Sequence, residues 1–191
     1  FSGVTGVQTC ALPISHAPVA EVCALLRAAG GRPLLVGGCV RDALLGLPIG
    51  EIDIEVFGLG TRQVETALRR RFGIVTVGAA FGVTKVKDHP IDVSVPRREN
   101  RTGVKHTDFD VQADPTMTPK DAAERRDFTA NAILWDPATG ELIDPWGGVA
   151  DLQKKVFRHV SAKFSEDPLR VLRAMQFAAR FGFAVAPETV E

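Results

Sequence analysis

The chain has 191 residues, of which 45% are hydrophobic and 24% charged, and its 23 basic and 23 acidic side chains give a formal net charge of zero. These proportions are ordinary for a soluble globular protein, and the overall charge gives no reason to expect nucleic-acid binding, although a local basic patch remains compatible. No apolar run is long enough to span a bilayer, so we expect no membrane association. Cys10, Cys23 and Cys39 lack metal-ligand spacing, which favours a reducing, cytoplasmic location.

The two ends of the chain look atypical. Residues 4–14 read VTGVQTCALPI, which resembles the translation of a DNA adapter used for sequencing libraries; a short disordered tail is the alternative. We therefore treat residues 1–15 as a non-native or disordered tail and leave them out of fold reasoning. The chain stops just after Pro187 and Glu188 signal a new helix, so we expect a reading frame truncated at both ends.

Hydrophobic periodicity and turn residues predict the elements in chain order. Up to residue 95 we expect helices over 18–29, 40–45 and 61–71, and strands over 33–36, 52–57, 74–77, 83–86 and 91–95. Beyond it we expect a long loop over 97–119, helices over 119–132, 152–156 and 168–181, and a short strand over 141–143. This order argues against a doubly wound sheet and predicts an α+β fold, in which a small mixed sheet with helices on one face precedes an all-helical region.

A glycine turn precedes the helix expected over 40–45. Gly37 and Gly38 follow a short strand, and Arg41 comes three positions after Gly38. Glycine turns let backbone N–H groups converge on phosphate oxygens, and an arginine can clamp phosphate through two parallel hydrogen bonds. We expect this turn to bind phosphate. Asp42 either orients Arg41 or caps the helix, and the two roles are about equally supported.

Carboxylates alternate along the strand that follows the glycine turn. Glu51, Asp53 and Glu55 share one face, opposite apolar neighbours, and Asp92 lies on a later strand. A solvated strand face is the plain alternative, but acids that face a phosphate-binding turn repel the ligand unless a cation intervenes. Two acids on one strand and one on a neighbour predict a Mg²⁺ site for phosphoryl transfer, with Glu51 and Asp53 as ligands and Asp92 as the third acid.

Two arginine-containing segments follow. Arg126 lies in an ERRDF run, and Arg170 and Arg173 share one face of a helix that Asp167 precedes. An acid with an arginine can present acceptors and donors to a base edge, which could select C and A over G and U. From the residues alone, a surface ion-pair network and a capped helix with exposed arginines are the favoured interpretations.

Three motifs together resemble one family. They read LVGGCVRDALLGLPIGEIDIEVFGL, ERRDFTANAILWDPATGELIDPWGGVADLQKKVFRHV and FSEDPLRVLRAMQFAARFGF. In this order they are similar to the bacterial tRNA nucleotidyltransferases, the class II CCA-adding enzymes of the polymerase-β-like superfamily, over roughly residues 30–191.

The resemblance implies a catalytic head over residues 16–150 and the start of a helical neck over 151–191. It implies template-independent transfer of CMP and AMP from CTP and ATP to the 3′ end of tRNA, with Mg²⁺ as cofactor and pyrophosphate as product. By the same resemblance the expected nucleotide-binding residues are Gly37, Gly38, Arg41, Arg126, Asp167, Arg170 and Arg173, and Asp53 is a metal ligand.

One departure from the family pattern leaves alternatives open. Glu51 holds a position that is normally aspartate, and its extra methylene displaces the carboxylate by about 1 Å, a misplacement that can cost about 100-fold in rate. A catalytically weakened nucleotide- or RNA-binding fragment is therefore one alternative. Others are a bacterial poly(A) polymerase and an enzyme that adds only the CC or only the A portion.

Overall fold

The structure is a computed structural model that describes residues 17–77, 82–101 and 109–190. The sequence prediction for residues 1–15 lies outside these ranges. The helices are α1 (Ala17–Ala28), α2 (Gly38–Leu44), α3 (Thr61–Leu68), α4 (Pro119–Glu124), α5 (Gly148–Lys154), α6 (Leu169–Phe181) and α7 (Pro187–Val190), with 3-10 helices η1 (Thr129–Asn131) and η2 (Ala162–Glu166). The strands are β1 (Arg32–Val36), β2 (Ile52–Phe57), β3 (Ile74–Val77), β4 (Val83–Val86), β5 (Ile91–Ser94), β6 (Arg97–Arg101), β7 (Phe109–Ala113), β8 (Leu134–Trp135), β9 (Leu142–Ile143), β10 (Val156–Phe157) and β11 (Ala184–Val185).

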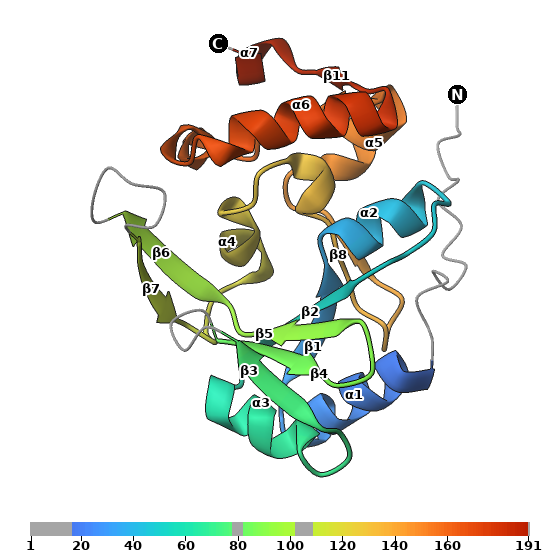
Figure 1. Ribbon diagram of the computed structural model, residues 1–191, viewed down its shortest axis with the longest axis vertical. Helices are drawn as coiled ribbons and strands as arrows, with labels where there is room; N and C mark the ends of the chain where they lie inside the picture. Colours follow the sequence, from blue (N-terminus) through green and yellow to red (C-terminus); the bar gives the residue numbers. More distant parts are fainter. Residues whose placement is uncertain (1–16, 78–81, 102–108, 191) are drawn as a thin grey trace, which may run out of the picture.

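A seven-stranded mixed sheet forms the centre of the molecule (Figure 1). Its strand order is β3-β4-β5-β2-β1-β8-β9, and β2 and β5 run parallel while the other neighbours run antiparallel. This confirms the expected α+β class with a small mixed sheet. The parallel β2–β5 pair sets the register of the site, because it aligns the acidic residues of two strands.

The two faces of the sheet bury different side chains, as the alternation of strand residues requires. Ile52, Ile54 and Val56 of β2 belong to a large apolar cluster with residues of α1, α2 and α3. On the other face Phe57 packs with Ala122 and Ala123 of α4 in a smaller cluster. Because α4 covers only part of that face, the side chain of Asp53 can be reached from solvent, whereas Glu55 on the same face is buried.

Two sequence predictions between residues 97 and 132 are wrong. β6 and β7 pair antiparallel as a two-stranded ribbon, whereas the sequence predicts a loop here. The prediction misses the strand because β6 reads RRENR and has no apolar periodicity. The expected helix over 119–132 ends at Glu124. After it the carboxylate of Asp127 accepts hydrogen bonds from the Phe128 N–H and from Asn131 Nδ2, each at 2.8 Å, and this competes with helical bonding.

The helix predicted over 152–156 is displaced: α5 begins at Gly148, ends at Lys154 and is followed by β10. α6 confirms the helix predicted over 168–181 to within one residue. It is joined to the rest of the molecule by aromatic packing, since Phe177 lies 5.7 Å from Phe128 and 5.5 Å from Phe157 between ring centroids. This contact brings the helix with the predicted base-reading residues against the ERRDF segment.

Among the glycines that the structure describes, Gly148 is the one most closely packed against main chain. A Cβ built on Gly148 would lie 2.1 Å from the Thr129 carbonyl oxygen. We expect Gly148→Ala to lower the free energy of unfolding by about 3 kcal/mol, since the main chain of η1 cannot move aside as a side chain can. Urea unfolding measures this, with Gly50→Ala as control because a Cβ at Gly50 meets open space. Equal midpoints for the two variants would contradict the packing of α5 on η1.

Candidate active site

The strand register places three charged side chains in a row on one face of the sheet. Asp53 of β2 is aligned with Asp92 of β5, and Asp92 is aligned with Lys85 of β4. The Lys85 Nζ donates to Asp92 Oδ2 at 2.5 Å. Glu51, which precedes β2, is exposed beside them. The structure thus brings Asp53 and Asp92 together as predicted, and Glu51 lies at the open end of β2.

The neighbouring carboxylates on this face of the sheet affect the pKa of Asp53. Burial raises the pKa of Asp53, the Arg126 guanidinium lowers it, and the charges of Asp92 and Glu51 raise it further, so the net shift is upward. When ionisation of a carboxylate is unfavourable in the protein alone, a bound cation stabilises the ionised form most strongly. A cation close to Asp53 would therefore favour its ionised form.

The glycine turn lies directly beside Asp53. A Cβ built on Gly37 would lie 3.1 Å from Arg126 Nη1 and 3.6 Å from Asp53 Oδ2, and the φ of Gly37 is +77°. Only glycine fits here without moving the arginine. The turn, the Arg126 guanidinium and the Asp53 carboxylate therefore meet at one point, where a phosphate oxygen and its counter-cation could both be held.

Glu55 lies on the same face of β2 as Asp53, but its side chain does not reach the open part of the site. Its side chain is fully buried, its Oε1 accepts from Arg125 Nη2 at 2.9 Å, and its Oε2 lies 3.5 Å from Arg126 Nη2. Oε2 accepts no hydrogen bond in this arrangement. The two arginines explain the burial, because a carboxylate enters the interior only when it is paired. Glu55 thus holds Arg126 against the glycine turn.

Arg41 lies deeper than the sequence prediction implies. It is 4% exposed, its Nε donates to Asp42 Oδ1 at 2.8 Å, and its Nη1 donates to Asn131 Oδ1 at 2.6 Å. Its guanidinium carbon lies 4.7 Å from the centre of the Phe181 ring of α6. Arg41 therefore joins α2 to η1 and α6 from beneath Gly38, and Asp42 orients it rather than capping the helix.

The predicted base-reading residues lie where α6 meets the ERRDF segment. Arg170 donates to the carbonyls of Lys163 and Arg125, at 2.6 and 2.9 Å, and Arg173 Nε donates to Asp127 Oδ2 at 2.7 Å. Asp167 is half-buried, and its carboxylate accepts the Leu169 N–H at 3.0 Å. These contacts form a continuous path from α6 through residues 125–127 to Gly37 and Asp53.

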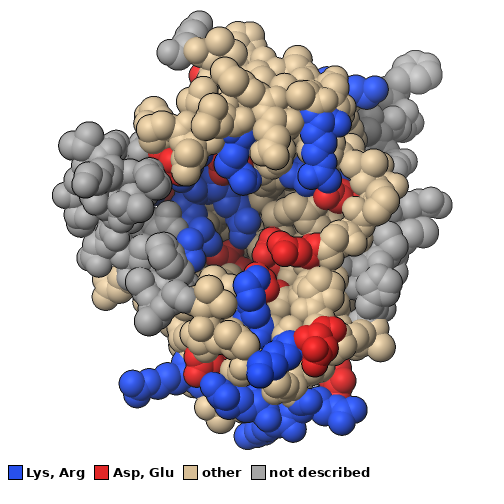
Figure 2. Space-filling model, in the orientation of Figure 1, with Lys and Arg blue, Asp and Glu red and all other residues tan. Residues whose placement is uncertain are grey.

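The molecular surface is hollowed between α6 and the sheet (Figure 2). Lys and Arg side chains gather on the α6 side of this hollow, whereas on the sheet side Asp and Glu side chains lie next to Lys and Arg side chains. The arrangement suits an elongated ligand that carries anionic groups and a metal ion at the same end.

The donor set of the site fits a divalent cation that a ligand helps to bind. Among residues 17–77, 82–101 and 109–190, no group of three or more His, Cys, Asp or Glu side chains is arranged to hold a metal ion. Mg²⁺-type cations are commonly held by one or two carboxylates together with substrate phosphates, and Asp53 and Asp92 supply that number. We expect phosphate oxygens to complete the coordination.

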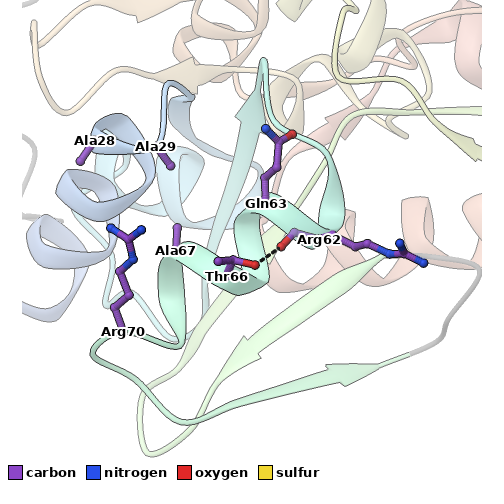
Figure 3. Close-up of a pocket in the computed structure, with 7 residues that line it drawn as sticks. All are labelled: Ala28, Ala29, Arg62, Gln63, Thr66, Ala67 and Arg70. Carbon is purple, nitrogen blue, oxygen red and sulfur yellow. Dashed lines mark hydrogen bonds between the residues drawn. The ribbon is translucent and has the colours of Figure 1, made fainter.

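A separate cavity of about 370 Å³ lies between α1 and α3, on the opposite face of the sheet. Arg62 and Arg70 line it, but they point in different directions (Figure 3). Thr66 Oγ1 is already used by the Arg62 carbonyl at 2.8 Å. The lining groups do not converge on a common point, so this cavity offers no comparable site.

Sequence reasoning missed two residues of the site. Lys85 lies in β4, and only the antiparallel pairing of β4 with β5 aligns it with Asp92. Asn131, the acceptor for Arg41, falls within the helix that the sequence predicts over 119–132, but the structure places it in η1. The i, i+4 spacing of Asp127 and Asn131 was the available signal for this second residue, because their side chains bond to each other.

Comparisons with known proteins agree with this geometry. The family described as Poly A polymerase head domain matches residues 34–158. A multifunctional CCA protein of Xylella fastidiosa (strain M23) is 46% identical over 159 residues, which cover 82% of this chain and 37% of the relative. A multifunctional CCA protein of Stenotrophomonas maltophilia (strain K279a) is 45% identical over 159 residues, with 82% of this chain and 38% of the relative covered.

Solved structures give the same result. The CCA-adding enzyme of Bacillus stearothermophilus in complex with CTP superposes with a TM-score of 0.75 at 32% identity, over 91% of this chain and 42% of that one. A tRNA nucleotidyltransferase complexed with a primer tRNA and an incoming ATP analogue gives a TM-score of 0.71 at 32% identity, over 88% and 47%.

The fold and the carboxylate pair define a nucleotidyltransferase-type head, and the chain belongs to the Poly A polymerase head domain family. Within this family the chain is similar to CCA-adding enzymes. It spans little more than a third of the length of the two CCA proteins named above. The family implies a divalent metal cofactor. In the described part of the chain, no helix has both the length and the apolar character needed to cross a membrane.

The contact between Gly37 and Arg126 is testable. We expect Gly37→Ala to weaken binding of inorganic triphosphate by about tenfold or more, because the new methyl group displaces the guanidinium and strains a backbone at φ +77°. Gly46→Ala is the matched control, since Gly46 has φ +66° and open space around it. Calorimetric titration compares the two. A loss of equal size in both variants would assign the effect to backbone strain alone.

Proposed function

We propose that this chain is the catalytic head, with the beginning of the following helical region, of a CCA-adding tRNA nucleotidyltransferase. The reaction is template-independent transfer of CMP and AMP from CTP and ATP to the 3′ end of tRNA, with release of pyrophosphate. The observation that carries the proposal is the meeting of Asp53, Asp92, Gly37 and Arg126 at one point in a head-domain fold. Similarity to enzymes solved with CTP and with primer tRNA supports the choice of substrates.

Each residue of the chain has a proposed task. The sequence prediction gave Glu51 and Asp53 as the metal ligands. Because β2 and β5 align Asp53 with Asp92, these two carboxylates would hold Mg²⁺, and exposed Glu51 is proposed as a further acidic neighbour. When bound, the cation activates the attacking hydroxyl and stabilises the charge that develops on the phosphates. Gly37 and Gly38 let the backbone approach the triphosphate, and Arg126 pairs with its oxygens. Phosphate binding by Arg41 was also predicted, but its burial and its engagement by Asp42 and Asn131 favour a positioning role.

Base selection is assigned to the start of α6. Asp167 presents acceptors and Arg170 presents donors, which together could pair with the edges of C and A while rejecting G and U. Arg173 supports them by fixing α6 to Asp127. In this conformation Arg170 donates to two main-chain carbonyls, so base pairing requires its guanidinium to exchange at least one of them for the nucleotide.

A division into head and neck is part of the proposal. The sequence prediction set the boundary at residue 150, whereas the head-domain match extends to residue 158 and α5 contacts η1. We therefore place the change from head to neck after α5. We propose action in the cytoplasm, where tRNA and nucleoside triphosphates are both present.

Transfer to tRNA tests the function. We expect the protein to extend a tRNA that lacks its terminal CCA with labelled CMP and, after it, AMP, in the presence of Mg²⁺. Incorporation of AMP alone would favour the poly(A) polymerase alternative, and addition of CMP alone would favour a CC-adding enzyme. Retained CTP binding without transfer would favour a weakened nucleotide-binding fragment. For that case Glu51→Asp is the informative variant, because it restores the shorter carboxylate of the family pattern.

A further inference from the structure

Asp53, Asp92 and Lys85 lie in a row across three neighbouring strands, and Lys85 is the member of this row whose positive charge repels a metal ion. β4 lies outside β5 in the sheet, and the register aligns Lys85 with Asp92. The Lys85 Nζ lies 2.5 Å from Asp92 Oδ2, while its side chain is 46% exposed and that of Asp92 is 22% exposed. The ammonium group thus reaches from solvent onto the carboxylate that the metal needs.

We infer that Lys85 is a resident counter-cation of Asp92 that competes with the divalent metal for this carboxylate. The inference rests on the proposed function, because it takes Asp53 and Asp92 as the metal ligands. Both cations seek the same oxygen atoms, and each favours its own pairing at the expense of the other. In the nucleotide-free protein Asp92 is therefore occupied, and the metal depends mainly on Asp53.

The ion pair is suited to exchange. Lys85 is a flexible, well-hydrated point charge, and an exposed lysine–carboxylate pair contributes little to stability. Arg126 differs in both respects, since it is 16% exposed and lies beside the buried Glu55. The site therefore combines one fixed cation at the glycine turn with one movable cation at Asp92.

A bound triphosphate gives Lys85 another anionic partner. When Lys85 turns to the phosphates, Asp92 becomes free for the metal, so nucleotide and metal each favour binding of the other. This coupling limits metal binding in the absence of nucleotide. It also accounts for a lysine at a position where its charge otherwise only weakens the metal site.

Binding of Mn²⁺ to the 191-residue chain without nucleotide tests the inference. Mn²⁺ takes the same hard oxygen ligands as Mg²⁺, and electron paramagnetic resonance reports its free fraction directly. We expect Lys85→Met to tighten Mn²⁺ binding about tenfold, because a unit charge near the ligands is removed. Lys87→Met is the matched control, since Lys87 is exposed and its stem lies against Gly73. Its effect should stay within about twofold.

The gain should depend on Asp92. We expect Lys85→Met to raise Mn²⁺ affinity clearly less in an Asp92→Asn background than in the wild type, because only the charge–charge effect of Lys85 on Asp53 is then left to remove. Equal affinities for Lys85→Met and Lys87→Met would overturn the inference while leaving the metal site intact, provided that Asp53→Asn still abolishes binding. Absence of Mn²⁺ binding in all variants would overturn both the inference and the proposed site. Thermal melting checks that each variant is folded.

Discussion

Asp53→Asn is expected to stabilise the empty protein and to abolish the Mg²⁺-dependent part of CTP binding. Burial and the charges of Asp92 and Glu51 make ionised Asp53 costly, and asparagine keeps its shape without the charge. The same charge is what holds the metal, so its loss should reduce Mg²⁺-dependent nucleotidyl transfer by about 1,000-fold. Thermal unfolding and calorimetric titration with CTP, each with and without Mg²⁺, measure the two effects.

The stabilisation by Asp53→Asn should depend on pH in a defined direction. The pKa of Asp53 is raised in the folded state, so the folded protein binds a proton more readily than the unfolded chain. Stability due to this group therefore falls as pH rises through the window between its ordinary and its raised pKa. The melting temperature of the variant should exceed that of the wild type at pH 7, and the difference should vanish at acidic pH. Asp88→Asn, in an exposed turn, is the control.

Glu55→Gln is expected to cause the largest loss of stability among the charged residues of the site, about 3–5 kcal/mol in the free energy of unfolding. The carboxylate is fully buried between Arg125 and Arg126, and its removal leaves guanidinium charge without its partner. Urea unfolding measures the loss. Glu21→Gln is the control, because Glu21 pairs with Arg71 at 2.8 Å with side chains 43% and 67% exposed, and such surface pairs contribute about 0–1 kcal/mol.

Loss of Glu55 should also weaken triphosphate binding, since Arg126 is no longer held against Gly37. Glu55→Asp is expected to recover part of both losses, because a shorter acid still pairs with one arginine. A Glu55→Gln protein with wild-type stability would show that the pair is not a structural element. A destabilised protein with unchanged triphosphate affinity would show that Arg126 finds its position without Glu55.

The sequence was sufficient to predict which carboxylates of two strands lie close together. The alternation of Glu51, Asp53 and Glu55 predicts that these acids point to one face of a strand. The parallel pairing of β2 with β5 places Asp92 next to Asp53, as expected. The α+β class followed from the order of helices and strands. These features depend on local periodicity, which is visible in one stretch of sequence at a time.

Other features depend on contacts between distant segments and could not be predicted in this way. Glu55 lies on the same face of β2 as Asp53. It is buried because Arg125 and Arg126, about 70 residues later in the chain, pack against it, and a pattern within β2 cannot show this. The role of Lys85 depends on the pairing of β4 with β5. The β6–β7 ribbon was missed because strand pairing, rather than an apolar face, forms it.

Calorimetric titration of the 191-residue chain with CTP, ATP, GTP and UTP, each with and without Mg²⁺, tests the central claim most directly. The proposed metal-dependent site with base selection by Asp167 and Arg170 predicts that CTP and ATP bind, that Mg²⁺ strengthens their binding, and that GTP and UTP bind at least about tenfold more weakly. Equal binding of all four nucleotides, unaffected by Mg²⁺, would contradict both the metal site at Asp53 and the base selection at α6.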